Sequence, residues 1–142
     1  MKLLFFLASL FAASQAQFSI GAPKAGATLH AGQKVGVQVI VPIDTSPAAG
    51  VEEVSLVVGI VGCGSAACPA PSADLGEILF IGKFVGQGVI GNTLNQFENF
   101  TFTVPSDISG KASVQVQHAY VLTPPGHSLP SIEYTSVAVQ VK

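Results

Sequence analysis

The chain has 142 residues, a length that fits one domain of ordinary size. Eight acidic and six basic residues give a net charge of −2, and the lysines are scattered along the sequence. Nucleic-acid binding needs clustered Lys and Arg that displace the counterions of phosphate groups. This composition therefore argues against a nucleic-acid partner.

The N-terminal residues indicate a secretory leader. Lys2 is followed by an apolar run over residues 3–13, and Ser14-Gln15-Ala16 has the small-x-small pattern of a signal-peptidase site. A membrane anchor is the alternative, but the run is shorter than the roughly 20 residues that cross a bilayer. We therefore predict a signal peptide over residues 1–16 and a secreted mature domain, residues 17–142, with no membrane span.

The mature sequence is typical of an all-β protein. It is rich in Val, Ile, Phe and Thr, and Gly and Pro interrupt it at short intervals. Period-2 alternation predicts strands with one buried face, whereas the more continuously apolar segments 53–62 and 77–85 predict central strands. In chain order, the expected strands are 18–22, 27–30, 34–41, 53–62, 77–85, 99–104, 112–121 and 134–141.

Strands of this kind need a second layer about 10 Å away that covers their apolar faces. We therefore expect an immunoglobulin-like antiparallel β-sandwich of seven or eight strands. The sequence has no Trp and no widely spaced Cys pair that could join the two sheets. It thus predicts a β-sandwich that lacks the inter-sheet disulfide and the buried Trp of an antibody domain.

Cys63 and Cys68 are the only cysteines, and small residues separate them. Because the chain enters an oxidising compartment, we expect these two residues to form a structural disulfide. A redox dithiol would more typically have Cys-x-x-Cys spacing, and a zinc site would need further ligands nearby. We therefore expect no metal.

Asn99-Phe100-Thr101 is an acceptor sequence for N-glycosylation. Phe100 and Phe102 share one face of the expected strand, so that Asn99 lies on the opposite, solvent-facing side. We predict a glycan on Asn99, with an unused acceptor sequence as the alternative.

No catalytic motif is present. His30, His118 and His127 stand alone, and the sequence contains neither a metalloprotease helix motif nor a Gly-x-Ser-x-Gly elbow. Single histidines on strands and loops are usually surface or structural residues. We expect no catalytic residues and no cofactor, and a hydrolase with a scattered active site is the alternative.

The Pro-rich segment 120–130 joins two strongly predicted strands. Tyr120, Leu122, His127 and Leu129 in this segment form a candidate recognition loop, because binding residues are often carried on loops of a rigid scaffold. A plain hairpin connection is the alternative.

Several segments resemble one known family. The apolar run 54–60, followed by Leu75-Gly76-Glu77-Ile78-Leu79-Phe80-Ile81-Gly82, is similar to the "apolar strand, then Leu-Gly-x-x-Leu-x-x-Gly" core of the fungal necrosis-inducing secreted proteins. The succession 99–105, 110–112 and 135–141 also follows that family's order. The resemblance covers residues 51–142, and the Cys63–Cys68 loop and His118-Ala119-Tyr120 depart from the family pattern.

The resemblance implies a small secreted fungal effector, a virulence protein without catalytic residues. Such effectors act by binding host plant receptor kinases and dampening immune signalling. The alternative is an extracellular cell-wall or carbohydrate-binding module, since the Pro23, Gly26 and Gly32 lead-in also resembles fungal cell-wall assembly proteins. Carbohydrate binding usually needs aromatic platforms, and the sequence has no Trp and only two Tyr.

Overall fold

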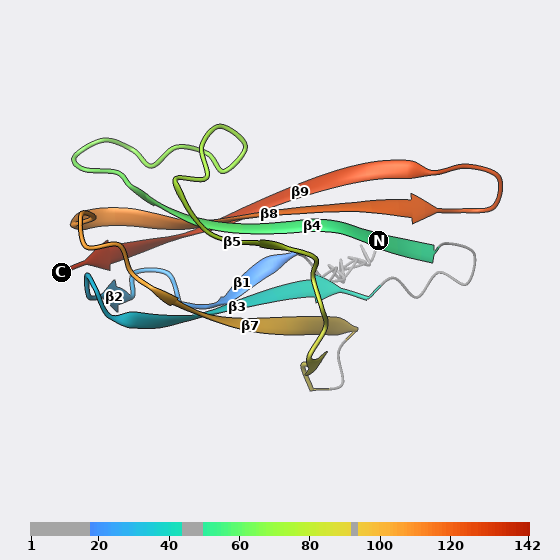
Figure 1. Ribbon diagram of the computed structural model, residues 1–142, viewed down its shortest axis with the longest axis horizontal. Helices are drawn as coiled ribbons and strands as arrows, with labels where there is room; N and C mark the ends of the chain where they lie inside the picture. The colour runs from blue at the N-terminus through green and yellow to red at the C-terminus, as the bar shows by residue number, and fades with distance from the viewer. Residues whose placement is uncertain (1–17, 44–49, 92–93) are drawn as a thin grey trace, which may run out of the picture.

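The computed structural model describes residues 18–43, 50–91 and 94–142, and the predicted signal peptide lies outside them. The described residues form nine strands and no helix (Figure 1). No helix that could cross a membrane is found among them. The strands are β1 Ser19–Ala22, β2 Thr28–Leu29, β3 Lys34–Pro42, β4 Gly50–Gly62, β5 Glu77–Gly82, β6 Gly88–Val89, β7 Asn95–Thr103, β8 Gly110–Thr123 and β9 Leu129–Val141.

The strands form two sheets packed face to face, which confirms the predicted all-β, two-layer architecture. One sheet has the order β1-β3-β7-β6 and the other the order β2-β9-β8-β4-β5. In Figure 1, β4, β8 and β9 lie above β1, β3 and β7. Neighbouring strands are antiparallel except β2 and β9, which run parallel.

The core fills the space between the two inner faces. Strands β3, β4, β8 and β9 each contribute alternate residues to it. The period-2 pattern predicts this for β3, β8 and β9, and β4 lies inside its sheet, as its more continuously apolar sequence predicts. These side chains are branched and aliphatic, so they pack closely on a pleated surface. They include Val37, Val39, Leu56, Val58, Ile60, Val114, Val116 and Val139, none more than 1% exposed.

The segment after β5 differs from the prediction. Residues 77–85 were expected to form a central strand, but β5 ends at Gly82 and lies at the edge of its sheet. Beyond Gly82 the chain crosses toward the other sheet, where Phe84 is buried in the core and Gly88 pairs with Phe97. This pairing makes the short strand β6 in a Gly-rich segment that the sequence predicts to be a turn.

A β-bulge in β4 sets which of its side chains face inward. Glu53 pairs with Tyr120 and Ser55 with Ala119, so Val54 is the extra residue on this strand. A bulge reverses the alternation locally. Glu53 and Leu56 can therefore both face the core, whereas Val54 is 48% exposed.

The loop from residue 63 to residue 76 covers part of the outer face of the five-stranded sheet. It contains the Cys63–Cys68 disulfide, with a Cα–Cα distance of 4.9 Å, which confirms the predicted pairing. The loop covers Gln115 of β8, whose side-chain Nε2 donates a hydrogen bond of 3.0 Å to the Pro69 carbonyl. The disulfide thus stiffens a loop that packs on the sheet.

Candidate functional site

A cleft of about 530 Å³ lies between the sheets at the end where β3 finishes and β9 begins. This is the right-hand end of the sandwich in Figure 1, where the hairpin of β8 and β9 extends beyond the other strands. Its walls combine five apolar residues with two carboxylates, an amide and a phenol. The lining residues are Val41, Pro42, Ile43, Val51, Leu122, Glu53, Gln96, Tyr120 and Glu133.

Strand register brings the polar residues together. Glu53 of β4 pairs with Tyr120 of β8, and Glu133 of β9 pairs with His118 of β8. His118 and Tyr120 are two residues apart, so both side chains lie on the inner face of β8. Strand β4 and the hairpin of β8 and β9 therefore converge on one polar cluster, formed by Glu53, His118, Tyr120 and Glu133.

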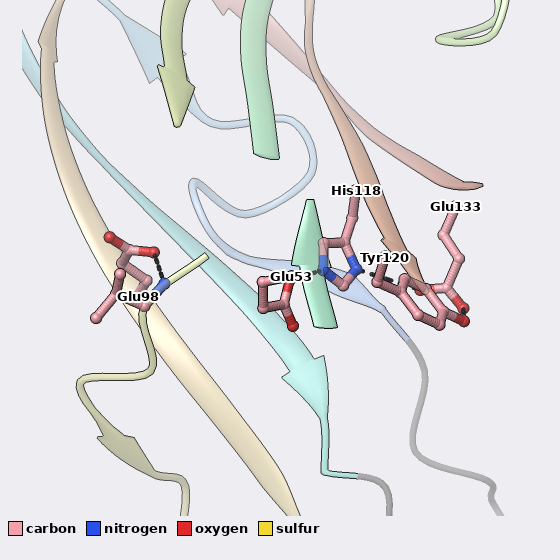
Figure 2. Close-up of polar contacts among 6 residues, drawn as sticks. Glu53, Glu98, His118, Tyr120 and Glu133 are labelled. Carbon is pink, nitrogen blue, oxygen red and sulfur yellow. Dashed lines mark hydrogen bonds and ion pairs between the residues drawn. The ribbon is translucent and has the colours of Figure 1, made fainter. Parts of the chain in front are cut away.

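His118 is the buried centre of this cluster and is 1% exposed. Its Nε2 lies 2.6 Å from Oε2 of Glu53, within hydrogen-bond distance. Its Nδ1 lies 3.7 Å from Oε2 of Glu133 and has no hydrogen-bond partner within the described part of the chain. Figure 2 shows the imidazole between the two carboxylates.

Aromatic rings hold the imidazole in place. The ring centroids of Phe18, Phe84 and Tyr120 lie 5.4, 6.1 and 5.0 Å from that of His118. Such packing restricts rotation of the ring and keeps Nε2 directed at Glu53.

The two carboxylates that flank the buried imidazole also line the cleft. The side chain of Glu53 is 25% exposed and that of Glu133 is 41% exposed. The Tyr120 hydroxyl donates a 3.2 Å hydrogen bond to Oε1 of Glu133 and so helps to orient it. With both carboxylates ionised, the cluster carries a net charge of −2 when the imidazole is neutral and −1 when it is protonated.

Glu98 is a second inward-facing carboxylate, on β7, but it lies apart from the His118 cluster (Figure 2). It is 8% exposed, and its Oε2 accepts a 2.7 Å hydrogen bond from the backbone N–H of Val85. Burial raises the pKa of Glu98, and the hydrogen bond from Val85 partly opposes this rise. Glu98 therefore fixes the crossing segment after β5 rather than the cleft.

The cleft offers carboxylate, phenol and amide groups to a ligand. Among the described residues that line it, none is a Ser, Thr, Cys or Lys. No group of three or more potential metal ligands is placed to hold an ion in the segments that the structure describes. The carboxylates, the phenol and the amide can instead form hydrogen bonds to a polar or cationic ligand.

The residues of the predicted recognition loop are found in different environments. Tyr120 and Leu122 belong to β8 and line the cleft. Leu129 opens β9, pairs with Leu122 and is 49% exposed. His127 is exposed in the turn between the two strands. The loop is thus confined to residues 124–128, since the strands extend further than the Pro residues suggest.

The predicted glycosylation site lies on the other sheet. Asn99 is exposed on β7, and its Oδ1 accepts a 3.1 Å hydrogen bond from Nε2 of Gln38. In β7, Glu98 is buried, so the adjacent Asn99 points away from the core. A glycan on Asn99 remains a prediction and would leave the cleft open.

Sequence reasoning did not identify Glu53, His118 and Glu133 as a group. A signal was present, because His118 and Tyr120 continue the inner-face alternation of Val114 and Val116. A histidine at a core position of an apolar strand needs buried partners. The identity of those partners depends on strand pairing, which the sequence pattern does not specify.

Comparison with known proteins assigns the chain to no family. No protein-family model matches it, and no curated protein matches its sequence.

Proposed function

We propose that this protein is a small secreted binding protein of the fungal effector type and that its partners are plant immune receptor kinases. The observation that supports a binding role is the open cleft, with its apolar walls and its polar groups Glu53, Gln96, Tyr120 and Glu133. Ligand sites typically combine a concave, mainly apolar surface with a few placed polar groups. The resemblance to the necrosis-inducing secreted proteins supports the kinase partner.

Secretion is supported by two features. The N-terminal sequence has the pattern of a signal peptide. The Cys63–Cys68 disulfide is compatible with an oxidising compartment, where such bonds persist. An exposed Asn99 in an acceptor sequence agrees with passage through the same compartment.

The immunoglobulin-like variety of sandwich is also part of this proposal. In immunoglobulin constant-type domains, strands A, B, E and D form one sheet and strands C, F and G form the other. The orders β1-β3-β7-β6 and β9-β8-β4 correspond to A-B-E-D and G-F-C. The parallel strand β2 and the edge strand β5 extend the second sheet.

The test is retention of partners by the mature protein, residues 17–142, immobilised with its disulfide intact. We expect it to retain purified kinase domains of plant immune receptors and not an unrelated plant kinase. We also expect the protein to reduce the oxidative burst that a microbial pattern elicits in leaf tissue. Absence of both effects would contradict the proposal, and retention on chitin or β-glucan alone would favour the wall-module alternative.

A further inference from the structure

We propose that the cleft recognises a basic side chain of the protein partner, a Lys or Arg whose charged head group reaches Glu53 and Glu133. The proposal rests on the proposed function, because it takes the ligand to be a protein. It adds that the cleft selects its partner by a positively charged side chain.

The charge of the cleft is the first argument. Its lining includes two carboxylates and, in the described residues, no Lys or Arg. With both carboxylates ionised, the cluster with His118 keeps a net negative charge whether the imidazole is neutral or protonated. A cation would therefore be attracted in either state, and an anion would be repelled.

The buried imidazole is an independent argument. His118 is 1% exposed, and its Nδ1, which has no hydrogen-bond partner among the described residues, lies 3.7 Å from Oε2 of Glu133. Each lining carboxylate also has a neighbour within hydrogen-bond distance, Nε2 of His118 for Glu53 and the Tyr120 hydroxyl for Glu133. Oriented acceptors of this kind lose little freedom when they bind a donor.

The apolar wall decides between a bare cation and a side chain. Val41, Val51 and Leu122 lie in the same lining as the carboxylates. Lys and Arg pair an aliphatic stem with a charged end, and the stem gains by packing on such a wall. The volume of about 530 Å³ exceeds that of one side chain, so flanking residues of a peptide segment would also enter.

The probe is an acetylated and amidated pentapeptide with Lys or Arg at its centre between leucines. The matched peptide carries norleucine, which keeps the stem and removes the charge. Binding to the mature protein is followed by the backbone amide shifts of a ¹⁵N-labelled sample. We expect shift changes at Val51, Tyr120 and Leu122, and at least about ten-fold tighter binding of the charged peptides than of the norleucine peptide.

Two variants of the cleft, one control variant and the salt concentration complete the test. Glu53→Gln and Glu133→Gln should each lose most of the preference for charge, whereas Glu52→Gln, on the opposite face of β4, should retain it. If Glu53→Gln unfolds, the Glu133→Gln variant and the salt dependence of peptide binding still test whether the cleft prefers a charged side chain. The preference in the wild type should fall between about 0.05 and 0.5 M NaCl.

Equal affinity of the norleucine peptide, shifts outside the cleft, or an equal loss in Glu52→Gln would overturn the inference. These outcomes differ from failure of the proposed function. If kinase domains are retained but the peptides show no charge preference, only the inference fails. If basic peptides bind in the cleft but kinase domains do not, the proposed partner is wrong and the cleft chemistry stands.

Discussion

Nε2 of His118 lies 2.6 Å from Oε2 of Glu53, and His118 follows Val114 and Val116 on the inner face of β8. A buried imidazole without a partner would be costly, because the unmade hydrogen bond is not replaced by water. The pair therefore contributes to folding and also fixes Glu53 at the border of the cleft. Stability and the proposed binding site are coupled through this contact.

Replacing the imidazole should destabilise the domain. His118→Ala removes the partner of Glu53 and leaves a cavity among Phe18, Phe84 and Tyr120. We expect a loss of about 2–4 kcal/mol in the free energy of unfolding, measured in urea. His127→Ala changes an exposed residue in a turn and should stay within about 0.5 kcal/mol. Equal stabilities of the two variants would contradict the assigned role.

Glu98 should make stability depend on pH. Burial raises its pKa in the folded state above the ordinary value of 4.5, so the folded protein binds its proton more tightly than the unfolded chain. Stability from this group is full below pH 4.5 and is lost as the pH rises through the raised folded value. Glu98→Gln should therefore raise the melting temperature at pH 7 more than at pH 4. If calorimetry shows the same change in melting temperature at pH 7 and at pH 4, the predicted destabilisation by ionised Glu98 is wrong.

The close approach of the covering loop to β4 predicts a steric effect. A Cβ at Gly59 would overlap the carbonyl oxygen of Leu75. We expect Gly59→Ala to lower the free energy of unfolding by about 1–3 kcal/mol. Gly36 lies in β3 with open space at the Cβ position among the described residues, so Gly36→Ala should be neutral or stabilise by up to about 1 kcal/mol. Denaturant unfolding of both variants distinguishes these outcomes.

The disulfide should matter moderately. Cys63 and Cys68 are five positions apart, and closing so short a loop restricts the unfolded chain by about 2 kcal/mol in the chain-entropy account. The Cys63→Ser/Cys68→Ser variant should fold and lose about this amount of unfolding free energy. If circular dichroism shows the double variant to be unfolded, the disulfide is required for folding of the whole domain and does not merely stiffen the surface loop.

Regular strands could be predicted from the sequence. The alternation of Val35, Val37, Val39 and Val41 places β3 and its buried face correctly. The short strand β6 could not be predicted, because its two residues pair with β7 only after the chain has crossed between the sheets. The bulge at Val54 depends on pairing with β8 and likewise has no local signal.

The candidate site was only partly predictable. Tyr120 and Leu122 were expected in a recognition loop, and they line the cleft from a strand instead. Glu53 and His118 are 65 positions apart, so their contact arises from strand register alone. Composition and alternation describe single strands, whereas this site consists of residues from neighbouring strands.

We propose that the protein binds its partner through the cleft. The most direct test is the equilibrium affinity of the mature protein for a plant receptor kinase domain, measured by calorimetry. We predict that Glu52→Gln binds like the wild type and that Glu53→Gln/Glu133→Gln binds at least about ten-fold more weakly while remaining folded. Equal affinities of all three proteins for the kinase domain would contradict the claim.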